Sequence, residues 1–389
     1  MQLIKETLDR LSFLGSFNIK HFKSENEKYC ILPSLQDPRW IVPVFDKRLF
    51  ISSLALYQPS LLKAKFIKKM AILTAKSGLS EVIAKDNIYF QKKDDFIREL
   101  FKRDHLQYAI FTGTEGCHRK VTVQVMDKEG TILGYIKVSD NEETDILLKN
   151  EAEVLKDLLR LEIRTGLFPK TIYHGHINDV NILILDSLKS MNSGFSSSLS
   201  DSHVDFLTEI FNKTSDLKVF SESKFANDLR DRIARLESGK LRDSHEIASD
   251  FIGRNIGNIK IPFGLCHRDF TPWNTFFHNG MLYVFDWEYA ENGYPPLLDI
   301  YHFIIQDGIL VRHLNPKGLL KKIEKNRRLI NRYCDLIGID KNLTTPLLLC
   351  YLLDISLLYF EREKGRMERE LRHKIDIWAG MMELILVNS

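Results

Sequence analysis

The chain has 389 residues, which exceeds one average domain and predicts two lobes or domains. Its 44% hydrophobic and 28% charged residues are typical of a globular protein and exclude an intrinsically disordered chain. The net charge of +3 implies no acidic partner by itself, but the charge is unevenly distributed. Residues 1–104 hold 19 Lys and Arg against 12 Asp and Glu, and the remainder holds 36 against 40.

The five cysteines are scattered and show neither C-x-x-C nor Cys/His zinc spacing, which predicts reduced thiols and a cytoplasmic location. We find no signal-peptide pattern and no stretch of roughly 20 uncharged apolar residues, so no transmembrane segment is expected. The apolar region 346–360 contains Asp354 and is predicted to be a buried helix. No nucleic-acid partner is expected, because basic residues are not interleaved with aromatic ones.

Residues 1–104 carry no motif. Apolar spacing predicts a helix over 3–14, and short strands are expected at 29–33 and 40–45, separated by a turn at 36–39. A basic helix is expected over 60–77, ending at Gly78. Its five lysines and no acid leave two interpretations open: a solvated lysine face over a packed apolar stripe, or peripheral contact with an anionic surface.

Residues 105–139 are predicted to form a three-stranded antiparallel meander, with strands at 107–113, 121–127 and 131–139. Gly113 and Gly116 lie in its first connection, where the backbone has to take positive φ or approach a ligand closely. Lys137 lies in an apolar strand, where a lysine needs a partner. The helix expected from Thr144 offers Glu151 and Glu153 as candidates.

A glycine turn, a strand lysine and a helix glutamate in this order match the nucleotide-binding lobe of a kinase, with Lys137 binding phosphates and Glu151 holding the lysine. The buried strand at 181–187 then leads into the hinge between the lobes. Adenine is expected to bind there, at Leu185, Asp186 and Ser187. The serine- and glycine-rich stretch 187–202 is predicted to be a loop.

Helices are predicted over 201–213, 222–237 and 243–253, and later over 297–312, 316–336, 345–362 and 366–386. Between these groups lies the string His267-Arg-Asp-Phe-Thr-Pro-Trp-Asn274, followed twelve residues later by Asp286. Asn279-Gly280 is a strong hairpin signal, which predicts that Asn274 and Asp286 lie at the same end of a two-stranded ribbon.

These residues have the chemistry of phosphoryl transfer. Asp269 is the candidate base that orients the attacking hydroxyl and accepts its proton. Asn274 and Asp286 offer an amide and a carboxylate oxygen, which suit Mg²⁺ bound with ATP. His267 is expected to brace the loop.

The catalytic string and Val284-Phe-Asp-Trp-Glu-Tyr-Ala290 resemble the aminoglycoside phosphotransferase and choline kinase-like superfamily. The resemblance covers about 105–380 and implies an α+β, two-lobed protein-kinase-like fold. It implies an extension over 1–104 whose role is unknown, a nucleotide-binding lobe over 105–187 and a helical lobe over 188–389. Asp299 is implied to be structural, and Arg268 stands where the family commonly has a small residue.

Trp287-Glu288 follows Asp286 where a protein kinase has D-F-G, and the next helix leaves no room for an activation segment. The acceptor is therefore expected to be a hydroxyl of a small metabolite, sugar or saccharide-containing molecule. Alternatives are an aminoglycoside-type antibiotic kinase, and a pseudokinase or scaffold that uses 1–104 as an interaction module. The C-terminal helices are implied to form the acceptor pocket, with candidate residues Glu288, Asp307, Tyr359, Glu361 and Trp378.

Overall fold

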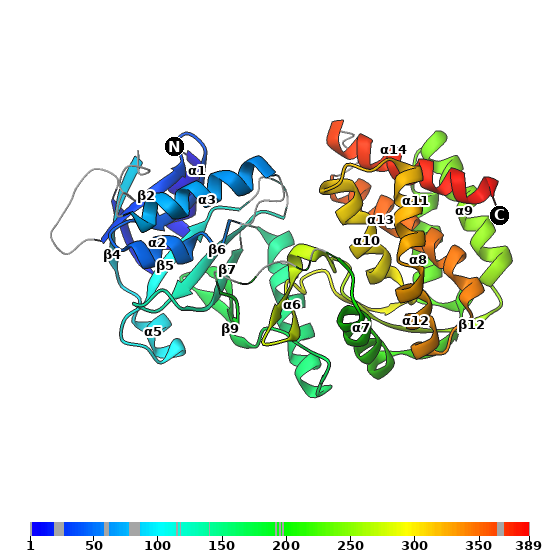
Figure 1. The fold of residues 1–389 in the computed structure, drawn as a ribbon, viewed down its shortest axis with the longest axis horizontal. Coiled ribbons are helices and arrows are strands. Elements are labelled where there is room, and N and C mark those ends of the chain that lie inside the picture. The colour runs from blue at the N-terminus through cyan, green and yellow to red at the C-terminus, as the bar shows by residue number, and fades with distance from the viewer. Residues whose placement is uncertain are drawn as a thin grey trace. The chain divides into compact units, whose positions relative to one another are not determined.

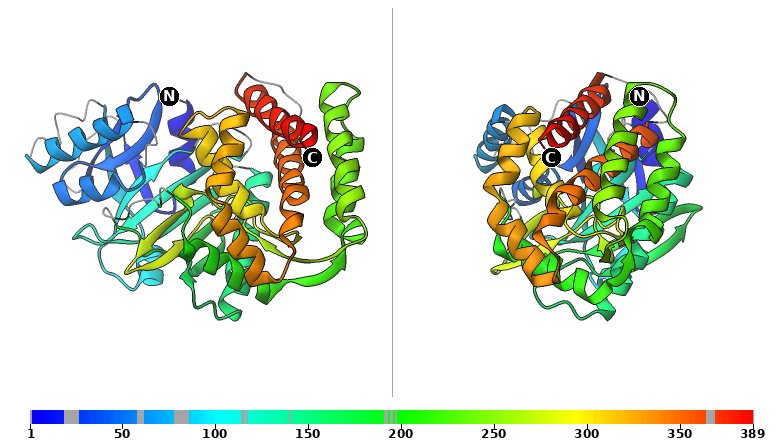
Figure 2. Two further views of the ribbon diagram at one scale, coloured as in Figure 1. Left: turned by 45° about the vertical axis from the view of Figure 1, so that its right-hand side comes forward. Right: turned by 90° about the vertical axis from the view of Figure 1, so that its right-hand side faces the viewer.

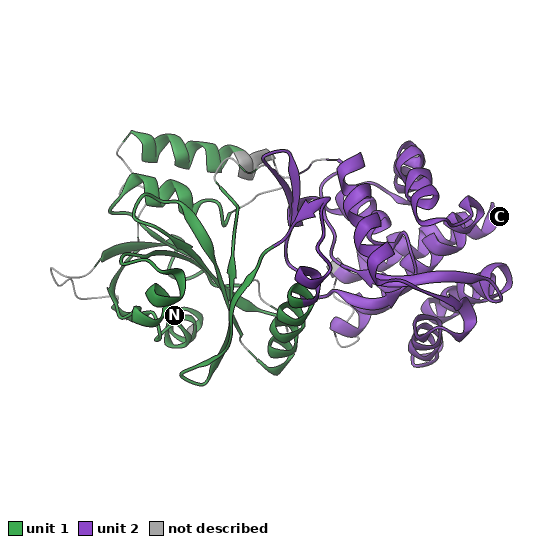
Figure 3. Ribbon diagram, turned by 90° about the horizontal axis from the view of Figure 1, so that it is seen from below, with its two compact units in different colours: residues 1–156, 169–193 green, residues 157–168, 194–389 purple. Residues whose placement is uncertain are grey.

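The computed structural model describes residues 2–18, 27–57, 62–77, 86–113, 116, 118–139, 141–190, 193, 196, 198–363 and 369–388. The chain divides into two compact units (Figure 3). Unit 1 comprises Met1–Lys156 and Pro169–Ser193, and unit 2 comprises Asp157–Phe168 and Gly194–Ser389. Unit 1 is built on a β-sheet, whereas unit 2 is mainly helical (Figure 1).

In the described part of unit 1, nine strands form one sheet in which every neighbouring pair is antiparallel. In spatial order they are β1 (Gly15–Asn18), β4 (Asp86–Lys92), β2 (Glu27–Pro33), β3 (Pro38–Pro43), β5 (Gln107–Phe111), β6 (Lys120–Met126), β7 (Ile132–Ser139), β10 (Val180–Asp186) and β9 (Thr171–Ile177). The helices are α1 (Gln2–Arg10), α2 (Lys47–Ser53), α3 (Leu62–Lys76), α5 (Asp95–Phe101) and α6 (Glu142–Arg160), whose last turn enters unit 2.

The predicted meander is present as β5, β6 and β7, but it is the middle of a wider sheet. β3 pairs with β5 through Trp40↔Phe111 and Ile41↔Ile110, so strands from the first 104 residues continue the same sheet. The expected division after residue 104 therefore falls inside one layer of hydrogen-bonded strands.

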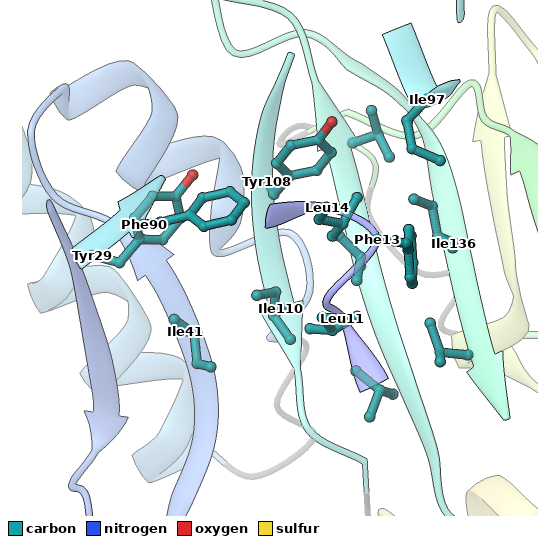
Figure 4. Packing of buried hydrophobic residues seen from close by; sticks show 14 of the residues in the cluster. Leu11, Phe13, Leu14, Tyr29, Ile41, Phe90, Ile97, Tyr108, Ile110 and Ile136 are labelled. Atoms are coloured by element: carbon teal, nitrogen blue, oxygen red, sulfur yellow. The ribbon is translucent and has the colours of Figure 1, made fainter. Parts of the chain in front are cut away.

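Side chains that alternate along the strands form an apolar core on each face of the sheet. On one face, Tyr29, Ile41, Phe90 and Ile110 pack together with residues that follow α1 (Figure 4). On the other face, Cys30, Val42 and Ala109 pack beneath α2 and α3. A strand has a side-chain period of two, so burial on both faces explains why these strands are apolar nearly throughout.

The predicted helix over 3–14 is wrong at its end, because α1 stops at Arg10. Leu11 and Leu14 follow in a turn and are fully buried in the first of these cores. Leu11 and Leu14, which the spacing placed in the last turn of the predicted helix, pack instead in the core of the sheet.

A truncated chain beginning at residue 105 is expected not to fold. It would lose Tyr29, Ile41 and Phe90, all buried, together with α2 and α3 on the other face. Loss of one large core side chain commonly costs about 3–5 kcal/mol, and a whole domain is stable by only about 5–15 kcal/mol. Circular dichroism and soluble yield of the truncated chain would check this, and a cooperative thermal transition in it would contradict the account.

Unit 2 contains two small sheets and a group of helices. Strand β12 (Lys260–Cys266) lies between β11 (Asp216–Val219) and β15 (Glu291–Tyr294), and β14 (Met281–Val284) lies between β13 (Thr275–His278) and β8 (Gly166–Leu167). The helices are α7 (Asp201–Thr214), α8 (Lys224–Ala234), α9 (Lys240–Ile256), α10 (Leu298–Leu310), α11 (Pro316–Lys325), α12 (Arg327–Ile337), α13 (Thr344–Arg362) and α14 (Arg369–Val387), with 3-10 turns η1 (Phe220–Glu222), η2 (Pro272–Asn274) and η3 (Lys341–Leu343). α9, α13 and α14 pack against one another (Figure 2).

Two helical features of unit 2 bear on the predictions. The single helix expected over 316–336 is two helices, because Asn326 lies between them and its side-chain amide donates to the carbonyl of Lys322 at 2.9 Å.

In the described part of the chain, one segment, Lys341–Arg362, is long and apolar enough to cross a membrane. It is 72% buried within unit 2, as the core helix of a globular protein would be.

Candidate active site

The loop that follows β12 is fixed by Asp299 at the first turn of α10. The carboxylate of Asp299 accepts from the backbone N–H of His267 at 2.8 Å and of Arg268 at 2.9 Å. Arg268 has φ +62°, a left-handed conformation that is costly for a non-glycine residue and needs such support. Asp299 thus holds the turn from which Asp269 projects.

His267 joins this loop to the strand that carries Asp286. Its Nδ1 accepts from the backbone N–H of Asp269 at 3.3 Å, so the ring proton lies on Nε2, which donates to the carbonyl of Phe285 at 3.2 Å. The ring is 1% exposed and packs on Trp287 with centroids 4.4 Å apart. These contacts brace the loop and leave His267 without access to a substrate.

The Asp269 carboxylate is held through both of its oxygens. Oδ2 accepts from Nδ2 of Asn274 at 2.8 Å, and Oδ1 lies 3.3 Å from Nε2 of His302. The same amide nitrogen of Asn274 donates to the Asp269 carbonyl at 2.9 Å. Both partners are acceptors, so the nitrogen has to face them, and the amide oxygen points to the opposite side.

His302 was missed by the sequence analysis. It lies in α10, is 4% exposed, and its Nδ1 is 3.3 Å from the hydroxyl of Tyr351, which is 3.4 Å from Nε2 of Gln306. A hydrogen-bonded chain therefore runs from α10 and α13 to Asp269. His302 and Gln306 are spaced four residues apart in a largely apolar helix, and this spacing is a signal that could have revealed them.

The predicted hairpin brings Asn274 and Asp286 to one end of the ribbon formed by β13 and β14. Thr275 pairs with Val284, and the next N–H, that of Phe285, donates to the carbonyl of Asn274 at 3.1 Å. Asp286 follows with φ +70°. Glu288, predicted for the acceptor pocket, is 5% exposed and has a carboxylate oxygen within 4.8 Å of one of Asp286. Two carboxylates this close repel each other unless a cation lies between them.

Phe270, whose role the sequence left open, is fully buried in the core beneath the loop. Its ring packs on His203 of α7 and on Phe303 of α10. Burial lowers the pKa of His203 to about 4, so this imidazole is neutral at pH 7. The aromatic cluster therefore fixes Phe270, and with it the loop, against α7 and α10.

Arg268 anchors the loop to α13 and β15. Its guanidinium donates to Glu291 at 2.9 Å, lies 3.6 Å from the carboxylate of Asp354 and stacks on the ring of Tyr294 with the central carbon 4.7 Å from the centroid. Burial opposes the charge, but Asp354, Tyr294 and Glu291 together raise the pKa of the Arg268 guanidinium above its ordinary value. An arginine at this position therefore has a structural explanation.

Three of the predicted acceptor-pocket residues have other roles. Trp378 is fully buried and packs edge-on against Tyr359, which gives it a role in the core of unit 2. Asp307 is buried and paired with Arg312 at 2.7 Å and with Lys322. The carboxylate of Glu361 pairs with Nε of Arg232 at 3.0 Å. The two acids are therefore neutralised by neighbouring cations within unit 2.

In unit 1, Lys137 of β7 and Glu151 of α6 form the predicted pair. Nζ lies 2.5 Å from Oε2, and the residues are 8% and 0% exposed. Glu153, the other candidate, is exposed and lies 3.9 Å from Lys149. α6 therefore presents Glu151 to the sheet and Glu153 to solvent.

Substitution Glu151→Gln is expected to destabilise unit 1 by about 3–5 kcal/mol, because it leaves Lys137 as a buried charge without its carboxylate. KM for ATP should also rise if Lys137 binds phosphate. Urea unfolding and steady-state kinetics measure the two effects. Glu153→Gln on the exposed face is the matched control, and equal unfolding midpoints for the two variants would contradict the pairing.

The predicted glycine turn between β5 and β6 contains Gly113 and Gly116, and both have positive φ. Gly113 has φ +91°, and a Cβ there would lie 2.6 Å from the carbonyl oxygen of Lys120, so the turn itself requires glycine. Gly116 has φ +144° and open space around it.

At the predicted hinge, Leu185 is buried at the end of β10. The N–H of Asp186 donates to the Lys170 carbonyl, and that of Ser187 donates to the Leu133 carbonyl. Burial raises the pKa of the Asp186 carboxyl. Both N–H groups are therefore committed to backbone carbonyls of unit 1.

Residues 218–309, which span β12, the catalytic loop, Asp286 and Asp299, match the model of the phosphotransferase enzyme family. The predicted family resemblance is confirmed. No curated protein sequence matches the chain significantly.

Among solved structures, the GDP complex of wild-type aminoglycoside 2'-phosphotransferase-IIIa is similar at 13% identity, with a TM-score of 0.50, over 74% of this chain and 96% of that chain. The ternary complex of a thermostable mutant of aminoglycoside phosphotransferase APH(4)-Ia with ADP and hygromycin B has 14% identity, a TM-score of 0.49 and coverage of 76% and 98%. ADP-bound aminoglycoside phosphotransferase APH(2'')-Ib has 18% identity, a TM-score of 0.46 and coverage of 75% and 97%. The first likeness shows the fold, a kinase-like α+β architecture, as predicted.

Proposed function

We propose that this chain is an ATP- and Mg²⁺-dependent phosphotransferase that moves the γ-phosphoryl group to a hydroxyl of a small metabolite, sugar or saccharide-containing acceptor. The observation that carries the proposal is the Asp269 carboxylate, which is held at both oxygens by Asn274 and His302 yet remains 31% exposed. A carboxylate oriented in this way can position a hydroxyl and accept its proton as the new P–O bond forms. The family match over the same residues supports the reaction class.

The side chains near Asp269 fit a magnesium ion. Asn274, Asp286 and Glu288 offer an amide oxygen and two carboxylates, which are the hard oxygen ligands that Mg²⁺ prefers. Bound there, the cation would neutralise charge on the nucleotide phosphates. We therefore propose that Glu288 belongs to the metal site and not to the acceptor pocket.

The acceptor itself is expected to be neutral or anionic. Asp307 and Glu361, which suggested a cationic acceptor, are already paired with Arg or Lys side chains. Arg362 and Lys374 lie over the ring of Tyr359, at 6.0 and 5.1 Å from its centroid.

Tyr289 lies close enough to Arg362 and to Asp269 for both charges to affect its hydroxyl. Burial raises the pKa of the Tyr289 hydroxyl, the nearby Arg362 lowers it, and Asp286, Asp269 and Tyr359 raise it further. Two cationic side chains beside Tyr359, those of Arg362 and Lys374, disfavour a polycationic aminoglycoside.

The test is an ADP-release screen over matched hydroxyl compounds that are neutral, anionic or cationic. We expect release that depends on Mg²⁺ and on a neutral or anionic acceptor. The same screen would decide between ATP and GTP as donor. Release with kanamycin-type drugs alone would favour an antibiotic kinase, and a complete lack of release across the panel would favour a scaffold.

His302 is proposed to position Asp269. His302→Ala is expected to lower kcat roughly ten- to a hundredfold with little change in KM for ATP, because the base loses one of its two anchors. His302→Gln, which can still donate a hydrogen bond, should restore part of kcat. His313→Ala, at an exposed turn after α10, is the control. A His302→Ala variant with full kcat and normal stability would exclude the positioning role.

A further inference from the structure

Helix α3 exposes the large apolar side chains that an amphipathic helix normally buries. Phe66, Ile67, Met70 and Leu73 are 64, 53, 46 and 58% exposed. At 100° per residue, they fall within an arc of about 120° on the helix surface. We refer to these four residues as the α3 stripe.

The opposite face of α3 is the one that packs on unit 1. Ala75 is fully buried, and Ala71 and Ile72 pack against the core beneath α2 and α3. Lys68 donates from Nζ to the carbonyl of Tyr57 at 2.6 Å, and burial lowers its pKa to about 8. The helix is therefore docked on unit 1 through Ala71, Ile72 and Ala75, as one interpretation expected, and through the hydrogen bond of Lys68. The α3 stripe is not part of that contact.

The charged side chains of α3 are all positive. Lys69 and Lys76 are exposed, and the segment 62–76 also contains Lys63 and Lys65 but no Asp or Glu. At 100° per residue, Lys69 and Lys76 lie along one margin of the stripe. Several apolar side chains bordered by lysines, on a helix lying flat on a folded unit, match the chemistry of a bilayer surface with anionic headgroups.

We propose that the α3 stripe docks this protein on an anionic lipid surface, with the apolar side chains entering the headgroup region and the lysines meeting lipid phosphates. A second copy of the chain fits less well. A two-fold pairing of the stripe would bring Lys69 and Lys76 against lysines of the same helix in the other copy. An isolated phosphate ion would leave the four apolar side chains in water.

The experiment is vesicle flotation of the full chain, with phosphatidylcholine alone and mixed with phosphatidylglycerol. We expect flotation with the anionic vesicles, weakening as salt is raised. Phe66→Ser with Leu73→Ser should reduce binding roughly tenfold or more. Each of Lys69→Gln and Lys76→Gln should reduce it about fivefold.

Matched controls lie on α6, where Ile146→Ser and Lys149→Gln remove one exposed apolar side chain and one exposed lysine. All variants should keep the wild-type circular dichroism spectrum, because the changed side chains are exposed. No flotation of the wild type, or flotation equally sensitive to the α6 variants, would overturn the proposal. A wild-type dimer that the Phe66/Leu73 variant converts to a monomer, without lipid binding, would overturn it in favour of a second copy.

Discussion

Asp269→Asn is expected to lower kcat for ADP release by roughly 10²- to 10⁴-fold and to leave the Kd for ATP nearly unchanged. The amide has the same shape as the carboxylate but cannot accept a proton from the attacking hydroxyl. Its single amide oxygen can accept only one of the hydrogen bonds that Asn274 and His302 make to the two carboxylate oxygens. The loop should still keep its conformation, because Asp299 and the ring of Phe303 also hold it. Steady-state kinetics and nucleotide titration measure the two quantities.

The matched control for this substitution is Asp335→Asn on α12, whose side chain is 61% exposed and pairs only with Lys341 among the contacts described. It should behave as the wild type. Turnover of Asp269→Asn at the wild-type rate would remove Asp269 from the mechanism, and a parallel loss of ATP binding would indicate a collapsed loop instead of a lost base.

Asp286→Asn is expected to raise the Mg²⁺ concentration needed for half-maximal rate and to lower kcat roughly 10²- to 10³-fold, because the site loses one of two adjacent carboxylates. Magnesium titration of the ADP-release rate is the measurement. Glu288→Gln should raise the same requirement for Mg²⁺ if Glu288 belongs to the metal site. An effect of Glu288→Gln on acceptor KM alone would return this residue to the acceptor pocket, as the sequence first suggested.

Much of the catalytic loop could be predicted from the sequence, because its geometry is local. The Asn279-Gly280 turn fixes the hairpin register, and the hairpin in turn places Asn274 and Asp286 together. The pairing of Lys137 with Glu151 could also be predicted, since a strand lysine in an apolar setting needs a carboxylate and the next helix offered Glu151 and Glu153 as candidates.

What could not be predicted depends on contacts between distant segments. His302 reaches Asp269 across 33 residues, and the neutralisation of Glu361 by Arg232 spans 129. Helical spacing alone does not tell whether an acid faces a cation or a cavity. The burial of Trp378 and the pairing of Asp307 could therefore not be predicted, because the packing of neighbouring helices decides which face is buried.

The first 104 residues illustrate the same limit for the fold. Strands β1 and β4 were not predicted. β4 lies between β1 and β2, and its place depends on pairings between residues far apart in the chain, such as Lys28 with Tyr89 and Gly15 with Lys92. Only the assembled sheet shows why Phe90 and Ile41 share one core while Cys30 and Val42 share another. Local patterns predict strands, but the partner of each strand is a tertiary property.

The central claim is transfer of phosphate to an acceptor hydroxyl by way of Asp269. Its most direct measurement follows the ³²P label of [γ-³²P]ATP in the presence of the best acceptor from the ADP-release screen. We expect the label to appear on a hydroxyl of that small molecule with the wild-type chain and to be absent from it with Asp269→Asn. Label that appears only as inorganic phosphate or on protein, or that reaches the acceptor equally with both chains, would contradict the account.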